Sequence, residues 1–125
     1  MMFKKIEYEL TVAMLNTVKV MIWVENDKLH YSKEILYRPG NTEKDVISPV
    51  SVEEFTKKIE ALRIDTWKKN YQPQGYVVLD GESWEVQYED TDGKKSKSSG
   101  DNAYPANWES FQELLTSVAG DVSID

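Results

Sequence analysis

Residues 5–24 read KIEYELTVAMLNTVKVMIWV, and apolar side chains occupy alternate positions through most of this segment. One side of an extended chain would carry Ile6, Tyr8, Leu10, Val12 and Met14. Because successive side chains of a strand point to opposite faces, this pattern predicts a half-buried β-strand. The alternation resumes from Val18 to Val24, where Met21 and Trp23 add apolar groups to the second face. We therefore expect the second strand to be central or to have both faces covered.

A turn and a third strand follow the first two. Residues 25–28, ENDK, are typical of a hairpin turn, since Asn and Asp tolerate a positive φ angle. The apolar positions of the antiparallel partner would be Leu29, Tyr31, Ile35 and Tyr37. Pro39 and Gly40 end this strand, because proline cannot donate to a strand ladder, and residues 41–48 are predicted to form a polar loop. The first third of the chain thus predicts a three-stranded meander.

Two amphipathic helices are expected, one in the middle of the chain and one near its end. Ser51 and Glu54 form an S-x-x-E capping box ahead of the first helix. The second helix would have Pro105 at its first position and Gly120 at its C-terminal cap. Both helices carry apolar residues at alternating spacings of three and four, which predicts one buried side for each.

The region between the helices contains weaker signals. A short helical turn after the first helix would carry Trp67 and Tyr71 on one face. Residues 76–79 and 84–89 predict two further strands, each followed by a polar turn. The lysine-rich residues 94–99 can form only a polar edge strand or a loop.

The predicted order of elements is β-β-β-α-β-β-(β)-α. It indicates an α+β fold in which an antiparallel meander sheet packs against two amphipathic helices. No linker rich in Pro, Gly or Ser divides the chain, so residues 1–120 are expected to form a single domain, followed by a flexible tail at 121–125.

Composition restricts the classes of function. The chain has 125 residues, 15 Lys and Arg against 22 Asp and Glu, and a net charge of -7. This charge opposes attraction to phosphate backbones or anionic lipid, so we expect neither a nucleic acid nor a membrane as partner. The absence of cysteine and of an apolar leader or span suits a cytoplasmic protein, and the sequence does not indicate the oligomeric state.

Few residues suit catalysis or metal binding. The one histidine, His30, falls opposite the apolar face of its strand and is expected to be solvated. With no cysteine, a metal site of nitrogen and sulfur ligands is excluded. Residues 90–93, DTDG, resemble the start of a calcium loop, but Lys94 stands where a further oxygen ligand is needed, so a plain hairpin turn is expected. We therefore expect no enzyme, no cofactor and no metal site.

The least ordinary feature is a spaced set of aromatic and polar residues in the second half of the chain. Its members are Trp67, Tyr71, Asp80, Trp84, Asn102 and Tyr104. In one interpretation the polar groups brace turns and caps while the rings fill the gap between helices and sheet. In the other, Asp80, Asn102 and Tyr104 converge in an aromatic-lined pocket of a small-ligand-binding domain or a carboxylate-based enzyme. The sequence leaves both interpretations open.

The same region contains the patterns W-x3-Y, D-G-x2-W and S-x-G-x-N-x-Y-P-x-N-W, between Trp67 and Trp108. In these motifs the chain resembles small uncharacterised bacterial proteins, of which relatives are often accessory or immunity-like. The resemblance implies no catalytic activity. Together with the acidic charge, it predicts a non-enzymatic module that binds another protein with a basic surface, with the six aromatic and polar residues as candidate contacts.

Overall fold

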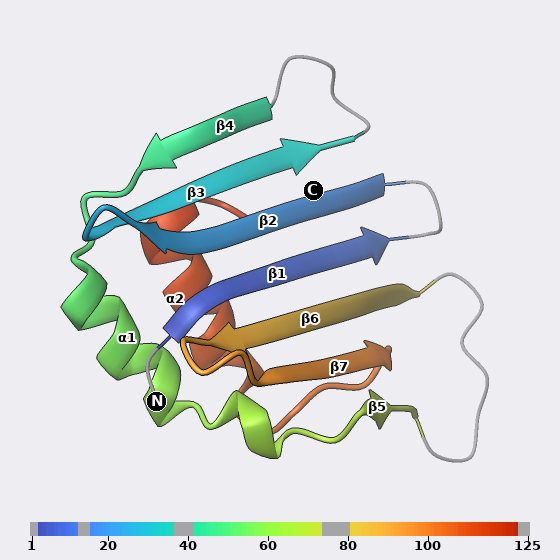
Figure 1. The fold of residues 1–125 in the computed structure, drawn as a ribbon. Helices are drawn as coiled ribbons and strands as arrows, with labels where there is room; N and C mark the ends of the chain where they lie inside the picture. The colour runs from blue at the N-terminus through green and yellow to red at the C-terminus, as the bar shows by residue number, and fades with distance from the viewer. Residues whose placement is uncertain (1–2, 13–15, 37–41, 74–80, 123–125) are drawn as a thin grey trace.

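A single mixed sheet organises the molecule. The computed structural model describes residues 3–12, 16–36, 42–73 and 81–122. These residues form a seven-stranded sheet with the order β4-β3-β2-β1-β6-β7-β5 (Figure 1). Its strands are β1 (Phe3–Val12), β2 (Asn16–Glu25), β3 (Lys28–Ile35), β4 (Thr42–Ile47), β5 (Asn70–Tyr71), β6 (Glu82–Asp90) and β7 (Lys95–Asp101). The α+β class and the central position of β2 are thus as predicted.

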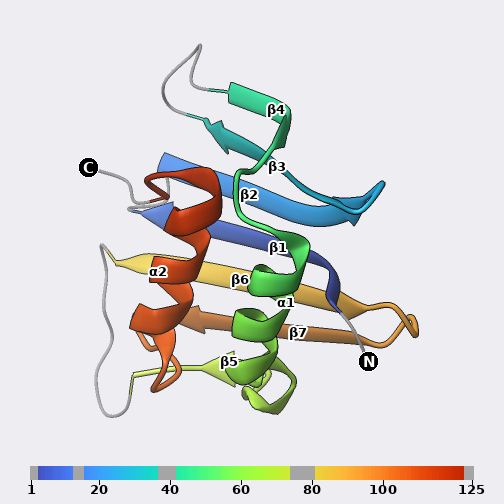
Figure 2. The same ribbon diagram turned by 90° about the vertical axis from the view of Figure 1, so that its left-hand side faces the viewer.

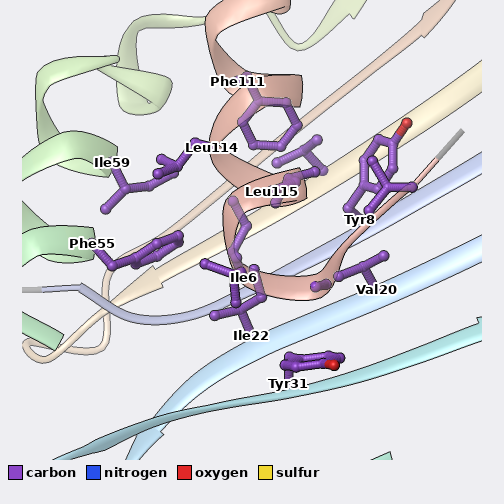
Figure 3. Packing of buried hydrophobic residues seen from close by; sticks show 14 of the residues in the cluster. Ile6, Tyr8, Val20, Ile22, Tyr31, Phe55, Ile59, Phe111, Leu114 and Leu115 are labelled. Carbon is purple, nitrogen blue, oxygen red and sulfur yellow. The ribbon is translucent and has the colours of Figure 1, made fainter. Parts of the chain in front are cut away.

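Two helices cover one face of this sheet (Figure 2). They are α1 (Val52–Ala61), which a 3-10 turn at Ile64–Thr66 follows, and α2 (Trp108–Ala119). Figure 3 shows their apolar side chains packed against those of the strands. The buried residues labelled there are Ile6, Tyr8, Val20, Ile22, Tyr31, Phe55, Ile59, Phe111, Leu114 and Leu115. Since burying one such side chain contributes about 1.5–3 kcal/mol, this layer is the main source of stability.

The ends of the helices follow local sequence signals in part. The Ser51 hydroxyl accepts a hydrogen bond from the backbone N–H of Glu54 at 3.0 Å, which confirms that half of the predicted capping box. The C-cap of α2 is Gly120, with a φ of 76°. However, α2 begins at Trp108 and not at Pro105. Pro105 lies in the preceding turn, where its carbonyl accepts a hydrogen bond from the Trp108 N–H.

Three predictions about the strands are wrong or incomplete. β4 forms where a polar loop was predicted, because its backbone pairs with β3 and its Val46 packs against the core. Tyr71 lies in β5, not in a helical turn, and β5 pairs with β7 in parallel, so the sheet is not purely antiparallel. The lysine-rich β7 is a strand but not the edge, since β5 pairs outside it. The strand predicted at 76–79 and Tyr37 lie outside the described residues.

The second face of the sheet is covered by neither α1 nor α2 (Figure 2). We call it the open face. By strand register it presents Glu7, Glu9, Lys19, Met21, Trp23, His30, Ser32, Glu34, Glu85 and Gln87. Among the helices described, none has the length and apolar character needed to cross a membrane. At the other end of the chain, the Val122 side chain is buried, although it belongs to the segment predicted to be a loose tail.

Candidate functional site

The structure brings the aromatic residues singled out in the sequence into one group on the helix-covered face. We call Trp67, Tyr71, Trp84, Tyr104 and Trp108 the aromatic cluster. The ring centroids of Trp84 and Trp108 are 4.5 Å apart, and those of Trp67 and Tyr71 lie 6.0 and 5.8 Å from Trp84. Tyr104 lies 5.3 Å from Trp108. Trp84 is only 2 % exposed, so the centre of the cluster is part of the core.

The indole N–H groups at the centre of the cluster are bound within the protein. Trp84 Nε1 donates to the Ala103 carbonyl at 2.9 Å, and Trp67 Nε1 donates to Asn107 Oδ1 at 3.0 Å. Asn107 Nδ2 in turn donates to the Leu62 carbonyl at the end of α1 at 2.7 Å. Asn107 is a bridging residue that the sequence reasoning missed, although the P-x-N-W pattern contains it.

Asn102 and Tyr104 both bind the start of β6. Asn102, which has a left-handed φ of 52°, accepts a hydrogen bond from the Glu82 backbone N–H at 2.9 Å. The Tyr104 hydroxyl donates a short hydrogen bond to the Glu82 carboxylate. Burial and this carboxylate raise the pKa of Tyr104. Asp80 lies outside the described residues, so of the three polar groups of the predicted pocket two are joined through Glu82.

Glycine is needed where β7 meets the aromatic cluster. A side chain at Gly100 would collide with the Trp84 indole nitrogen and the Ala103 carbonyl, the two groups that hydrogen-bond there. The S-x-G-x-N-x-Y pattern therefore supplies a close approach at Gly100, a left-handed residue at Asn102 and a hydroxyl at Tyr104. These contacts match the bracing interpretation of the pattern.

One polar pair near the cluster has no hydrogen bond. The hydroxyl of Tyr8 and the side-chain nitrogen of Gln112 are buried and without partners among the described residues. Burial raises the pKa of Tyr8, and the neighbouring Gln112 opposes that rise. Unpaired buried polar groups are uncommon, because each loses its hydration without compensation.

The open face offers a different arrangement, a broad hollow of about 490 Å³ beside β1, β2 and β3. We call it the acidic hollow. Its charged lining consists of Glu7, Glu9, Glu34, Glu43, Asp45 and Glu85 on the acidic side and Lys19, Lys33 and Lys44 on the basic side. Met21 is the apolar side chain at its middle strand, with Glu7 and Ser32 opposite it on β1 and β3. The hollow thus has an excess of negative charge.

The carboxylates of the acidic hollow lie close to one another across the strands. Register places Glu9 opposite Lys19 on one side and opposite Glu85 on the other. Like charges directly opposite in a sheet are destabilising. Within the described part of the chain, the carboxylates of Glu9 and Glu34 form neither a hydrogen bond nor an ion pair. These two groups are therefore available to a positively charged partner.

Two of the neighbouring lysines have partners among the described residues. Lys33 Nζ donates to the Ala119 carbonyl at 2.7 Å, at the end of α2, and lies 3.4 Å from Glu43. Lys97 Nζ lies 3.6 Å from Glu85. Lys33 is drawn to the helix-covered side, whereas on the open face Lys5 Nζ lies 3.0 Å from Glu7. Strand register places Lys19 opposite both Glu9 and Glu34.

His30 lies next to the acidic hollow and corrects a prediction. It was expected to be solvated but is 7 % exposed, because Trp23 and Asp45 cover it. The Trp23 and His30 rings stack with centroids 5.6 Å apart and an interplanar angle of 20°. Nδ1 lies 2.6 Å from Asp45 Oδ1, and Nε2 lies 3.2 Å from the Glu25 carbonyl. Sequence alternation predicted the correct face of β3 for His30, but it did not predict that Trp23 and Asp45 would cover the ring.

The chemistry of this histidine follows from its two acceptors. Each ring nitrogen of His30 faces an oxygen atom, Asp45 Oδ1 at Nδ1 and the Glu25 carbonyl at Nε2. The side chains of Glu25, His30 and Asp45 also offer ligand atoms within 4.8 Å of one another. A metal ion would need a free lone pair on a ring nitrogen and would have to replace one of these hydrogen bonds. The DTDG turn, by contrast, is internally satisfied, since Asp90 Oδ1 accepts from the backbone N–H groups of Asp92 and Lys94.

Comparisons with protein-family models, with curated proteins and with solved structures found no significant match to this chain.

Proposed function

We propose that this chain is a non-enzymatic protein-binding module that docks a basic surface of another protein onto its open face. The observation that carries the proposal is the acidic hollow, a concave surface whose lining includes six acidic residues and three lysines, with Glu9 and Glu34 unpaired among the described residues. A formal net charge of -7 adds a long-range attraction to a basic partner. The aromatic cluster then has a supporting role, because it fixes the helices beneath the sheet.

The chemistry of the open face suits recognition of charge. A desolvated cation is stabilised by carboxylates that already lie together, and their mutual repulsion is relieved when it binds. Glu9 and Glu34 are unpaired among the described residues, so binding need not break an existing ion pair at either position. An immunity-like protein that blocks a basic toxin or nuclease is the form of this function that the sequence resemblance favours.

Charge neutralisation of the open face tests the proposal. The triple variant Glu9→Gln, Glu34→Gln and Glu85→Gln keeps the size of each side chain and removes three charges from the acidic hollow. Wild-type protein should capture a partner of basic surface from lysate of its own organism, and the purified partner should bind the triple variant at least about tenfold more weakly at low salt, since close charge pairs dominate such interfaces. Calorimetry gives the affinity.

A matched control separates site from total charge. Glu53, Glu60 and Glu113 are exposed on the two helices, and changing all three to Gln removes the same charge from the other side of the molecule. This control should lower the association rate slightly and leave the dissociation rate as in wild type. Equal loss of affinity in both triple variants would show that no specific face is used and would contradict the proposal.

A second candidate function rests on the unpaired Tyr8 hydroxyl and Gln112 amide. A small polar ligand that hydrogen-bonds both groups next to Tyr104 would support the pocket interpretation of the aromatic residues. A thermal-shift screen of small metabolites tests it. Ligands found in this way should lose their effect in the variant Gln112→Leu if the pocket is real.

A further inference from the structure

Trp23 is placed unlike the other tryptophans. It is half-buried on the open face, and it is absent from the apolar core that the helices cover. Trp67, Trp84 and Trp108 all belong to that core or pack against it. A large aromatic side chain outside the core contributes less to folding than a buried one. Its position therefore calls for another explanation.

The Trp23 ring is held in place by a series of specific contacts. His30 stacks on it, and His30 is itself fixed by Asp45 and by the Glu25 carbonyl. Asp45 has a left-handed φ of 47° at the irregularity of β4, and its backbone N–H donates to Ser32 Oγ at 3.0 Å. A non-glycine residue in this conformation is strained, and such strain is often found at functional sites.

The surroundings of Trp23 combine apolar and charged groups. Lys5 lies opposite Trp23 on β1, and its Nζ is 3.0 Å from the Glu7 carboxylate. In the same cross-strand row, Ile47 is paired with His30 and is 58 % exposed. In the next row, Met21 is part of the acidic hollow, and Asp45 both lines that hollow and binds His30. An apolar centre with a charged rim is the usual arrangement of an interface hot spot, and Trp is strongly enriched at such centres.

We propose that Trp23 is the anchor residue of the docking face, and that His30 is the residue that positions it. The partner segment would place an arginine or lysine over Trp23, with its charged head among the carboxylates of the acidic hollow. A cation over an indole ring is attracted by the ring face, and the apolar stem of the same side chain packs on Met21 and Ile47. This inference rests on the proposed function, which it makes specific to a residue.

Indole N–H signals in a nitrogen-15 correlation spectrum test the location directly. The chain has four tryptophans, and the indoles of Trp67 and Trp84 donate to Asn107 and Ala103 on the helix-covered face. An acetylated hexa-arginine peptide should shift the Trp23 signal and leave those two signals in place. A hexa-citrulline peptide, of similar shape but uncharged, should shift none. Shifts confined to Trp67 or Trp84, or no shift at all, would overturn the inference.

The affinity of the captured partner for the Trp23→Ala variant tests whether Trp23 is the anchor residue. Trp23→Ala should weaken binding by tenfold to a hundredfold, in the range found for central hot spots. The other three indole signals and urea unfolding report whether the fold is retained. If Trp23→Ala binds as wild type while the Glu9, Glu34 and Glu85 triple variant does not, the open face is still the docking surface but Trp23 is not its anchor residue. If both bind as wild type, the proposed function fails as well.

The positioning role of His30 needs its own readout. His30→Ala removes the stacked ring and should weaken binding severalfold, and the Trp23 indole signal should broaden or move toward a free position. The double variant His30→Phe with Asp45→Leu restores an aromatic ring without the contact between the His30 ring and the Asp45 carboxylate. It should recover the Trp23 signal and most of the affinity. Recovery of stability without recovery of affinity would show that His30 acts only on the fold.

Discussion

The two faces of this sheet use aromatic residues in opposite ways. On the helix-covered face, Trp67 and Trp84 lie among other rings, and both indole N–H groups bind partners inside the protein. On the open face, Trp23 has one stacked neighbour and no place in the core. Glu82 accepts a hydrogen bond from Tyr104, whereas Glu9 and Glu34 on the open face are unpaired within the described residues.

The contrast between the two faces shows that an unusual sequence pattern is not by itself a sign of a binding site. The residues from Trp67 to Trp108 are distinctive because many contacts must be made at once to join the helices to the sheet. The open face has no distinctive pattern, since glutamates alternating along a strand are ordinary. Its character comes only from the register that places those glutamates side by side.

The largest effect is expected on the helix-covered face. Trp84→Ala removes a ring that is 2 % exposed and leaves the Ala103 carbonyl without its donor. We expect the free energy of unfolding to fall by about 3–5 kcal/mol, as for other buried tryptophans. Urea unfolding followed by circular dichroism measures it. A loss below about 1 kcal/mol would mean that the cluster is not a structural unit and would remove the contrast between the faces.

An intermediate effect concerns Tyr104 and alkaline pH. Tyr104→Phe should lower the free energy of unfolding by about 1–2 kcal/mol at neutral pH, because a hydrogen bond to a carboxylate is lost. The pKa of Tyr104 is raised in the folded state, so its contribution is complete below the unfolded value near pH 10 and is lost as the pH rises further. The free energy of unfolding, measured with urea between pH 8 and pH 11.5, should therefore fall less steeply with pH in this variant than in wild type.

Tyr88 provides the matched control for the alkaline series. Burial, with Glu60, Asp90 and Asp65 nearby, raises the pKa of Tyr88 to about 12. Tyr88→Phe should thus also reduce the decline above pH 10. The Tyr88 hydroxyl makes no hydrogen bond in the described structure. The stability of the Tyr88→Phe variant at neutral pH should therefore stay closer to wild type than that of Tyr104→Phe. If the free energy of unfolding fell equally with pH in wild type and in both variants, the raised pKa values of Tyr104 and Tyr88 would not explain the loss of stability above pH 10.

The smallest effect is expected on the open face, and it has the opposite sign. Glu9→Gln removes the like charge opposite Glu85 but also the attraction to Lys19 on the other side, so the free energy of unfolding should rise by at most about 0.5 kcal/mol at low salt. Added salt should reduce the gain. A gain in stability together with a loss of partner affinity would mark Glu9 as a residue kept for binding. Destabilisation instead would indicate that Glu9 supports the sheet.

Much of the fold could be predicted from periodicity and caps. Alternation identified β1 and β2 with their buried faces, and the capping box identified the start of α1. β4 was missed because its sequence, TEKDVI, has little alternation and its pairing includes an irregularity at Asp45. β5 was missed because two residues carry no periodicity, and only the distant β7 makes them a strand.

The candidate site was less predictable, for a physical reason. The contacts that bury His30 come from Trp23, seven positions earlier, and from Asp45, fifteen positions later. Neither spacing is a sequence signal, because only strand register brings the three side chains together. The six residues chosen from the sequence formed a local pattern, and the five that the structure describes lie at or beside the aromatic cluster.

The position of β1 has a consequence for synthesis. β1 precedes the other described strands in the chain, yet it is a central strand, and its second neighbour β6 begins only at Glu82. While the intervening residues are being made, one edge of β1 has free N–H and C=O groups beside an apolar face. Pairing between strands so distant in sequence is also slow. We therefore expect a product truncated before β6 to expose the long unpaired edge of β1 and to aggregate more readily than a chain that includes β6.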